Sequence, residues 1–370
     1  AGGGPARRAR ARAPPRRHRA GLTVRTDRVD LTARPDPSAR HTGPMSDSTP
    51  PPNASPTSNP TDHPVVVRVT RDLVAVVGPD AATYLQGQLS QDVAGLAVGD
   101  STWTFVLAPQ GKVEGWGRIT RVADDAFEVL VDAGAGEAWE ARLRRFLLRT
   151  KADITVTPAV PVLALRGEGS ADVVAATGPD AWRPAGWPAV DGFDLVLAGA
   201  AAEDAVTRVV GAGVVEVGAA ELEALRIRAV VPAWGSELDA DTIPATVGQW
   251  VIDASVSFTK GCYTGQELVA RIDSRGGNVP RLLHRAEVQG PPPSPGTPVL
   301  VDDVEAGSVT SSASVEGGSV ALCWVGRAVV VEPDGSPATV AGAPARVFSP
   351  PVVAPSPSAP SVPGRVSFGR

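Results

Sequence analysis

The chain has 370 residues, a formal net charge of −5 at pH 7 and two cysteines. Its first 44 residues hold eleven arginines and three aspartates, a net +8, which leaves −13 on the remainder and argues against a general nucleic-acid-binding surface. No apolar run reaches the roughly 18 residues that a membrane span needs. Two cysteines without CxxC spacing indicate neither a disulfide scaffold nor a zinc site, and they are typical of the reducing cytoplasm.

Both ends of the chain are predicted to be disordered. Residues 1–64 and 349–370 are rich in Pro, Ser, Gly or Arg and poor in apolar side chains. Met45 is the only methionine, and we interpret it as the true start, with residues 1–44 as upstream sequence. The alternative is an Arg-rich targeting peptide or a nucleic-acid-binding arm.

The first folded part is predicted over residues 65–152. Val65–Val77 is rich in valine but contains the polar triplet 70–72, which predicts two short strands rather than one. Gly78-Pro79-Asp80 then predicts the start of a helix. Further elements are predicted as strands at 102–107, 113–122 and 127–131, and as a helix at 137–147.

The second part is predicted over residues 153–289. Its expected elements are strands at 154–157, 162–165 and 193–197, and helices at 170–177, 201–210 and 219–227. A long loop follows from Val231 to Gly265. The apolar side chains in this loop favour a functional segment over a disordered one.

The last part is predicted over residues 290–348, after a Pro-rich turn. Short strands are expected at 298–301, 307–311, 320–325 and 328–331, a spacing typical of a small β-barrel. The whole pattern predicts an α+β fold rather than a regular βαβ alternation.

The most unusual segment is Lys260-Gly261-Cys262-Tyr263-Thr264-Gly265-Gln266-Glu267. It holds one of two cysteines, one of two tyrosines and one of three lysines, in a chain where arginine supplies the other 32 of 35 basic residues. Lysine is a compact titratable charge, whereas arginine is a permanently charged planar fork. We infer that this segment needs the smaller cation.

Cys262 has two interpretations. Lys260, two residues away, favours a thiolate, and Gly261 lets a ligand approach the backbone, so Cys262 is a candidate reactive thiol. The alternative is a small buried hydrophobic residue. Cys323, inside the apolar run 321–324, is expected in the core.

Other polar groups also have two interpretations. Gln266 and Glu267 orient a ligand, or they form the first turn of a helix. Residues 274–278 form a turn or, with Arg271 and Arg281, a cationic rim for an anionic ligand.

Amide-rich turns and scarce histidine give weaker signals. The turns at 85–93 and 107–113 could read a polar heterocycle, although capping explains their Gln, Asp and Gly equally well. His284 is the single histidine between the terminal segments, so Ser-His-Asp, Cys-His and multi-histidine metal mechanisms are poorly supported.

Together these segments resemble the YgfZ/GcvT folate-binding-like family over about residues 65–347. Residues 260–271 resemble the family motif K-G-C-Y-x-G-Q-E-x-x-A-R without a mismatch. L-Q-G-Q at 85–88, P-Q-G-K at 109–112 and G-S-V-T-S-S at 307–312 fall in the order that the family expects. The resemblance implies a glycine-cleavage T-protein-like α+β fold, with two related α+β parts around a central cavity and a small C-terminal β-barrel.

The resemblance also implies a function. It suggests a tetrahydrofolate-binding factor for the maturation or repair of [4Fe-4S] enzymes, with client enzymes or assembly proteins as partners and Cys262 as the reactive residue beside Lys260. No nucleic acid, membrane or metal bound by this chain alone is expected, because a lone thiolate cannot hold a cluster. Cys262 would act with a partner protein, a second copy or a small thiol, or in redox exchange. The expected folate contacts are Gly261, Tyr263, Gly265, Gln266, Glu267, Arg271, Arg226, Gln88 and Lys112.

The main alternative is an enzyme, a tetrahydrofolate-dependent aminomethyltransferase or demethylase of the T-protein type. That enzyme carries an aspartate pair after a Gly-Gly turn, and the matching stretch Gly111–Trp116 has no acid at the pair. It also carries a pterin-binding glutamate where this chain has Arg228, which accepts no hydrogen bond. Glu221 or Glu223 would have to substitute. A third interpretation is a protein of this fold that has lost folate and acts through protein contacts alone.

Overall fold

The structure is a computed structural model that describes residues 63–178, 182–197, 201–332 and 334–351, without the side chains of 201–203. The expectations for 1–62 and 352–370, including the start at Met45, lie outside the described residues. Within the described ranges, no helix is both long enough and apolar enough to cross a membrane.

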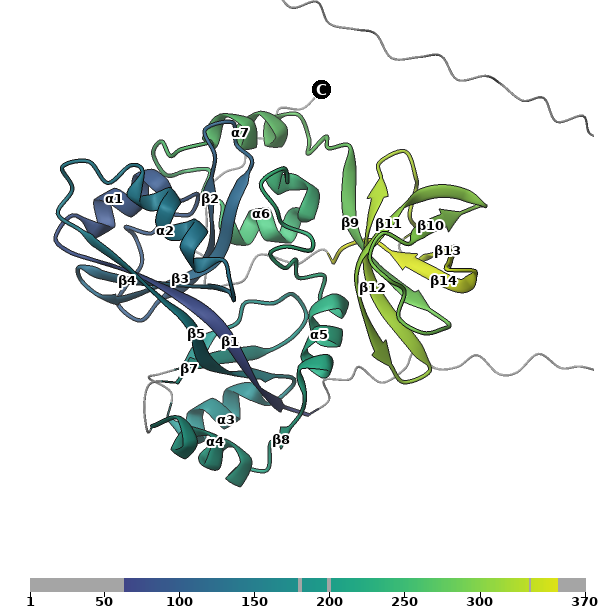
Figure 1. Ribbon diagram of the computed structural model, residues 1–370, viewed down its shortest axis with the longest axis horizontal. Helices are drawn as coiled ribbons and strands as arrows, with labels where there is room; N and C mark the ends of the chain where they lie inside the picture. The colour runs from purple at the N-terminus through teal and green to yellow at the C-terminus, as the bar shows by residue number, and fades with distance from the viewer. Residues whose placement is uncertain (1–62, 179–181, 198–200, 333, 352–370) are drawn as a thin grey trace, which may run out of the picture. The chain divides into compact units, whose positions relative to one another are not determined.

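A continuous, mostly antiparallel sheet is the frame of the body (Figure 1). Its strands, in spatial order, are β2 (Ser101–Leu107), β3 (Val113–Ala123), β4 (Ala126–Asp132), β1 (Val65–Val77), β5 (Asp153–Arg166), β7 (Gly192–Val196) and β6 (Trp182–Pro184), and the short β8 (Val215–Glu216) pairs with β1 in parallel. Because β1 pairs with both β4 and β5, the two predicted α+β parts share one sheet.

The division of Val65–Val77 into two strands was a wrong prediction. It forms one strand, and the polar triplet causes only a register shift against β5, after Arg71. Both charged side chains of the triplet have partners, since Arg71 faces Asp132 on the neighbouring strand and the buried Asp72 carboxylate accepts three backbone N–H groups. These donors are Gly134, Gly136 and Ala159. Burial acts to raise the pKa of Asp72, but the three donors bring it below its ordinary value.

The strands predicted at 154–157 and 162–165 are likewise one strand, β5. The helices are α1 (Ala81–Gln88), α2 (Gly136–Arg144), α3 (Ser170–Thr177), α4 (Ala201–Gly211), α5 (Ala219–Arg228), α6 (Gln249–Ser255), α7 (Gln266–Ser274) and the 3-10 helix η2 (Pro244–Val247). Helices η2 and α6 lie inside the segment that was predicted to be a long loop. This segment folds because residues 250–252 are buried in the main core.

The C-terminal strands close into the predicted small barrel. Its strands, in order around the barrel, are β10 (Pro298–Val301), β11 (Val304–Val315), β12 (Gly318–Gly326), β9 (Arg281–Val288), β14 (Ala343–Phe348) and β13 (Ser336–Val340). The barrel therefore begins at Arg281 rather than at 290, because β9 pairs with both β12 and β14. Residues 328–331 form no strand; Val329 and Val331 pack as loop residues against the barrel core. Cys323 is fully buried, as predicted.

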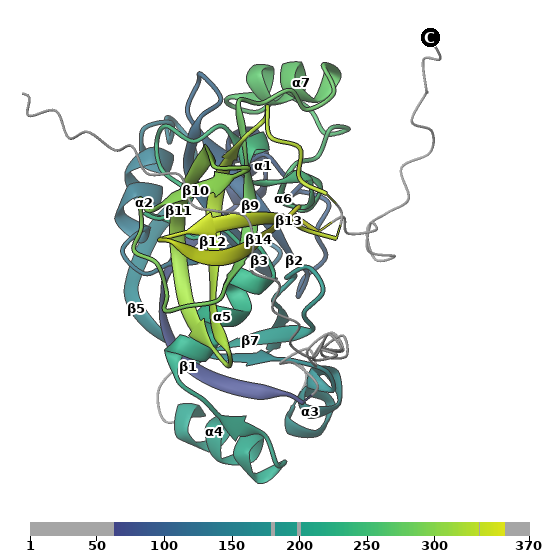
Figure 2. The same ribbon diagram turned by 90° about the vertical axis from the view of Figure 1, so that its right-hand side faces the viewer.

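Helix α5 and one buried carboxylate join the barrel to the body. Figure 2 shows the barrel strands in front of α5, which contacts β11 and β12 as well as β1. Glu237 is buried, and its Oε1 accepts the hydroxyls of Thr310 and Ser311 on β11, each at 2.6 Å. Its Oε2 accepts from Arg226 on α5 and from the Ala233 N–H, each at 3.0 Å. Part of the G-S-V-T-S-S segment thus attaches the barrel to the body.

Candidate functional site

Lys260 binds the loop that carries residues 260–265 to the C-terminal end of helix α1. The loop lies between α6 and α7, and the Lys260 Nζ donates to the backbone oxygens of Gln86, Leu89 and Gln91 at 2.6, 2.7 and 3.0 Å. These carbonyls lie at or just beyond the negative end of the helix dipole, where a cation is favoured. Burial lowers the pKa of Lys260 to about 8, with Asp92 acting in the opposite direction, so the group is mostly an ammonium at neutral pH.

Tyr263 and Thr264 continue this attachment. The Thr264 N–H donates to the Gly87 carbonyl at 3.2 Å. The Tyr263 ring is buried in the main core, 5.1 Å from the Lys260 Nζ, and burial raises its pKa to about 12. The motif therefore sits directly on the L-Q-G-Q segment, and Tyr263 is a core residue rather than a surface ligand contact.

Two glycines bring the motif against the P-Q-G-K segment. Gly265 precedes α7 with φ +83°, and a Cβ there would lie 2.6 Å from the Ala108 oxygen. Gly111 also has φ +83°, and its Cβ would lie 2.4 Å from the Leu268 Cβ. Because a side chain at either position would collide with the other segment, glycine is required at both. The three sequence motifs at 85–88, 109–112 and 260–267 form one cluster.

This motif cluster presents an exposed thiol. Cys262 is exposed, and a Cβ added at the neighbouring Gly261 would meet nothing within 4 Å. The reading of Cys262 as a buried hydrophobic residue is therefore wrong. Glu267 and Arg271 form an i,i+4 ion pair on the exposed face of α7, which begins at Gln266.

Lys112 and Gln88, two other residues that were expected to contact folate, bind groups of the protein itself. The Lys112 Nζ lies 2.5 Å from the Asp241 carboxylate in an exposed ion pair. The Gln88 amide oxygen accepts from the buried Arg142 at 3.1 Å. Both side chains therefore hold neighbouring segments together.

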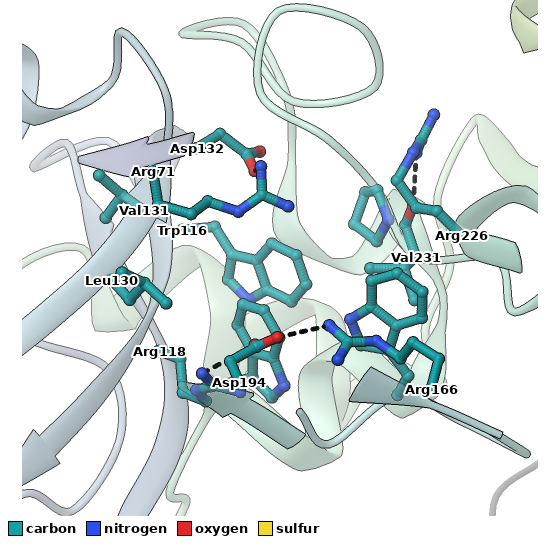
Figure 3. A pocket seen from close by; sticks show the side chains of 13 residues that line it. Arg71, Trp116, Arg118, Leu130, Val131, Asp132, Arg166, Asp194, Arg226 and Val231 are labelled. Atoms are coloured by element: carbon teal, nitrogen blue, oxygen red, sulfur yellow. Dashed lines mark hydrogen bonds and ion pairs between the residues drawn. The ribbon is translucent and has the colours of Figure 1, made fainter. Parts of the chain in front are cut away.

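The sheet, the segment after α5 and the Trp187 loop enclose a central cavity of about 490 Å³, counting the solvent at its mouth (Figure 3). Its lining combines aromatic and charged side chains. The charged ones are Arg71, Arg118, Asp132, Arg166, Asp194 and Arg226. Of the residues expected to contact folate, Arg226 lines this cavity; in the described part of the chain the others are not among its lining.

Asp194 holds two of the arginines in fixed positions. Its two oxygens each lie 2.9 Å from a guanidinium nitrogen, of Arg118 on β3 and of Arg166 on β5 (Figure 3). Burial acts to raise the pKa of Asp194, but Arg166 and then Arg118 bring it below its ordinary value. Two cations facing one carboxylate leave this part of the wall with an excess positive charge.

Tryptophans form the flat part of the wall. The rings of Trp103 and Trp116 stack at 4.0 Å with an angle of 11° between them, and the Arg166 guanidinium lies 4.3 Å from the ring centre of Trp187. Trp116 is oriented by its indole N–H, which donates to the Ser255 hydroxyl at 2.9 Å. Stacked aromatic and guanidinium planes are suited to a planar heterocyclic ligand.

Most residues that line this cavity were not predicted from the sequence. A charged residue inside an apolar run needs a partner in the fold, so it can indicate a site. This signal was present in the sequence, because an arginine interrupts or ends three apolar strands: Arg71, Arg118 and Arg166. The proposed substitutes for the pterin-binding glutamate do not line the cavity. Glu223 instead holds Arg226 through two hydrogen bonds, at 2.8 and 2.6 Å, and Glu221 is exposed.

The missing acid of the T-protein pair has a packing explanation. A Cβ at Gly115 would lie 2.2 Å from the Trp139 indole nitrogen, so no aspartate fits there without moving that ring. Glu114 in the same stretch instead pairs with Arg142 of α2 at 2.5 Å. Within the described residues, no group of three or more His, Cys, Asp and Glu side chains could hold a metal ion.

The single sheet, the central cavity and the closed six-stranded barrel define a protein of the glycine-cleavage T-protein fold. The family described as GCVT N-terminal domain matches residues 70–185. The structure of the glycine cleavage system aminomethyltransferase T from Bartonella henselae superposes with a TM-score of 0.64 at 24% identity, covering 78% of this chain and 86% of that one.

Two curated relatives agree with this class. The tRNA-modifying protein YgfZ of Edwardsiella ictaluri is 29% identical over 219 residues, which are 55% of this chain and 65% of the relative. The aminomethyltransferase of Bordetella avium is 28% identical over 202 residues, 48% of this chain and 55% of the relative. The chain thus spans less than two thirds of the length of either protein. The resemblance to the YgfZ/GcvT group that the sequence motifs indicated is confirmed.

Proposed function

We propose that this chain binds a reduced folate in the central cavity and assists the maturation or repair of [4Fe-4S] enzymes through Cys262. The observation that carries the proposal is the pairing of two features, an aromatic and arginine-lined cavity and an exposed thiol on a rigid cluster of three motifs. We propose an assembly factor rather than an enzyme, acting in the cytoplasm, where an exposed thiol stays reduced. Its partners would be [4Fe-4S] client enzymes or assembly proteins.

The cavity is suited to a folate in the chemistry of its walls. Trp116 offers an aromatic face, and Arg71, whose ion-pair contact with Asp132 is 3.4 Å long, offers donors for carbonyl and carboxylate oxygens. Gly115 and Arg228, where the T-protein carries acids, disfavour the alternative function of aminomethyl transfer.

Cys262 is suited to a contact with another molecule. Its loop is fixed by Lys260 and Thr264, and its side chain is exposed. Since one thiolate does not hold a cluster alone, it would act with ligands from a partner or a small thiol, or in thiol exchange. In this proposal Lys260 positions the thiol.

Calorimetric titration of the purified protein with tetrahydrofolate tests the ligand. We expect saturable binding below millimolar concentration, with quenching of tryptophan emission from Trp103 and Trp116. Glu221→Gln, on the exposed face of α5, is the matched control and should bind equally. Absence of binding at sub-millimolar ligand would rule out the folate part of the proposal.

Complementation tests the thiol. A strain lacking the native gene would receive the wild type, Cys262→Ala or Cys323→Ala, and the activities of its [4Fe-4S] enzymes would be measured. We expect Cys262→Ala to fail while it keeps its fold and its folate affinity. Cys323→Ala, a change at the buried cysteine, should restore the activities wherever it folds. Normal activities with Cys262→Ala would show that this thiol is not the functional group.

A further inference from the structure

Arg71 and Asp132 are neighbouring charged residues in the wall of the central cavity. They are directly opposite one another in the pairing of β1 with β4, and both line the cavity. Their side chains are 29% and 31% exposed, and the closest charged atoms, Arg71 Nη1 and Asp132 Oδ1, are 3.4 Å apart. Both side chains are therefore partly accessible to a ligand, and the ion-pair contact between them is long.

The other charged groups of the wall are held more firmly. Arg166 donates to the Leu165 and Phe193 carbonyls at 2.9 and 3.0 Å in addition to its ion pair with Asp194. Arg226 donates to the Val231 carbonyl at 2.6 Å as well as to two glutamates. A ligand could engage these groups only by replacing bonds that already stabilise the fold.

Asp132 keeps acceptor capacity. Its Oδ2 accepts the Trp234 backbone N–H at 2.9 Å, which fixes the carboxylate, while Oδ1 has the long contact to Arg71. An ionised carboxylate has about four acceptor sites and a guanidinium five donors. The pair thus presents unused acceptors beside unused donors, and Figure 3 shows both groups on the same side of the Trp116 indole.

We propose that Arg71 and Asp132 read the amide edge of a 2-amino-4-oxo heterocycle that lies against Trp116. Such a ring presents a carbonyl oxygen, a ring N–H and an amino group in a row. Arg71 donates to the carbonyl oxygen, and Asp132 accepts from the ring N–H and the amino group. The inference rests on the proposed folate function, because a reduced pterin carries this edge, and guanosine carries it as well.

Asp132→Asn tests the assignment, because asparagine can still accept the Trp234 N–H but presents an amino group in place of one acceptor. The probes are 6,7-dimethylpterin and 6,7-dimethyllumazine, which has a carbonyl in place of the 2-amino group. The wild type should prefer the pterin at least about tenfold, the effect of one charge-assisted hydrogen bond. Asp132→Asn should lower this preference to below about threefold. A preference that survives the substitution overturns the assignment.

Arg71→Gln provides an independent test. The carbonyl that Arg71 contacts is common to both probes, so this variant should weaken both and leave their ratio unchanged; an altered ratio overturns the assignment. The urea-unfolding midpoint of each variant checks the fold. If tetrahydrofolate binds but Asp132→Asn keeps the preference, the assignment fails and the proposed function stands. If tetrahydrofolate does not bind, while guanosine binds and is weakened by Asp132→Asn, the assignment stands and the proposed ligand is wrong.

Discussion

Replacing Lys260 with methionine should destabilise the protein measurably. The ammonium donates three hydrogen bonds to backbone carbonyls at 2.6, 2.7 and 3.0 Å. A hydrogen bond to a charged group contributes about 1.5 to 3 kcal/mol, and the carbonyls left without a donor add a cost. The three bonds share one ammonium, whose desolvation opposes them, so we expect a total loss on the order of 3 kcal/mol rather than the sum.

Lys260→Arg is the informative companion variant. It keeps the charge, but a planar fork cannot direct its donors at three carbonyls that converge on one nitrogen. We expect it to recover less than half of the stability lost in Lys260→Met. Urea unfolding followed by tryptophan emission measures both. A Lys260→Met variant within about 0.5 kcal/mol of the wild type, the usual range for a neutral surface change, would refute the reasoning.

The Lys260→Met variant also shows whether Lys260 positions the Cys262 thiol or stabilises its thiolate. Alkylation of the native protein reports on Cys262, because Cys323 is fully buried. If Lys260 only positions the loop, the pH midpoint of the alkylation rate should be the same in Lys260→Met and the wild type. A midpoint that moves upward in the variant would mean that the cation acts on the thiolate itself.

Three further predictions concern stability and use urea unfolding. Gly111→Ala should lower the free energy of unfolding by about 1 to 3 kcal/mol more than the matched Gly134→Ala. Both glycines have φ above +80°, but a Cβ at Gly134 meets nothing within 4 Å. Equal losses would contradict the close contact of the motifs. Glu237→Gln should cost about 3 kcal/mol, and Ser311→Ala about 1, because the first disturbs four hydrogen bonds and the second removes one; equal losses would contradict this. Asp72→Asn should lower stability by about 1 to 3 kcal/mol at pH 6. Because the folded pKa of Asp72 lies below the unfolded value of 3.8, this contribution is present above pH 3.8 and is lost as the pH falls through the folded value; a difference that persists in acid would contradict the assignment.

The sequence predicted most elements of the fold because local patterns determine them. Valine-rich runs predicted the strands, and Gly78-Pro79-Asp80 predicted the start of α1. The errors have physical causes. A polar triplet interrupts β1 in the sequence but not in the sheet, since Arg71 and Asp72 find partners that only the tertiary fold supplies. Helix α6 is short, and its stability comes from burial of residues 250–252.

The sequence likewise predicted one part of the candidate site and not the other. Rare residues identified the segment at Cys262, but not the contact of Gly265 with Gly111, which depends on how two distant loops pack. The central cavity was missed because its charged residues come from β1, β3, β4, β5, β7 and α5, and no spacing along the chain connects them. The elements of the fold were therefore easier to predict from the sequence than the residues that line the cavity.

The cavity and the motif cluster share one hydrogen-bonded frame. Trp116, in the cavity wall, donates to the Ser255 hydroxyl, and the Ser255 carbonyl accepts from the Ser90 hydroxyl at 2.6 Å. The next residue, Gln91, supplies one of the carbonyls that bind Lys260. A change at Trp116 would therefore disturb the aromatic wall of the cavity and the loop that carries Cys262 together, whereas Asp132→Asn changes the cavity alone. Comparing Asp132→Asn with Cys262→Ala in complementation, each beside its measured folate affinity, then decides whether the thiol needs a bound folate to act.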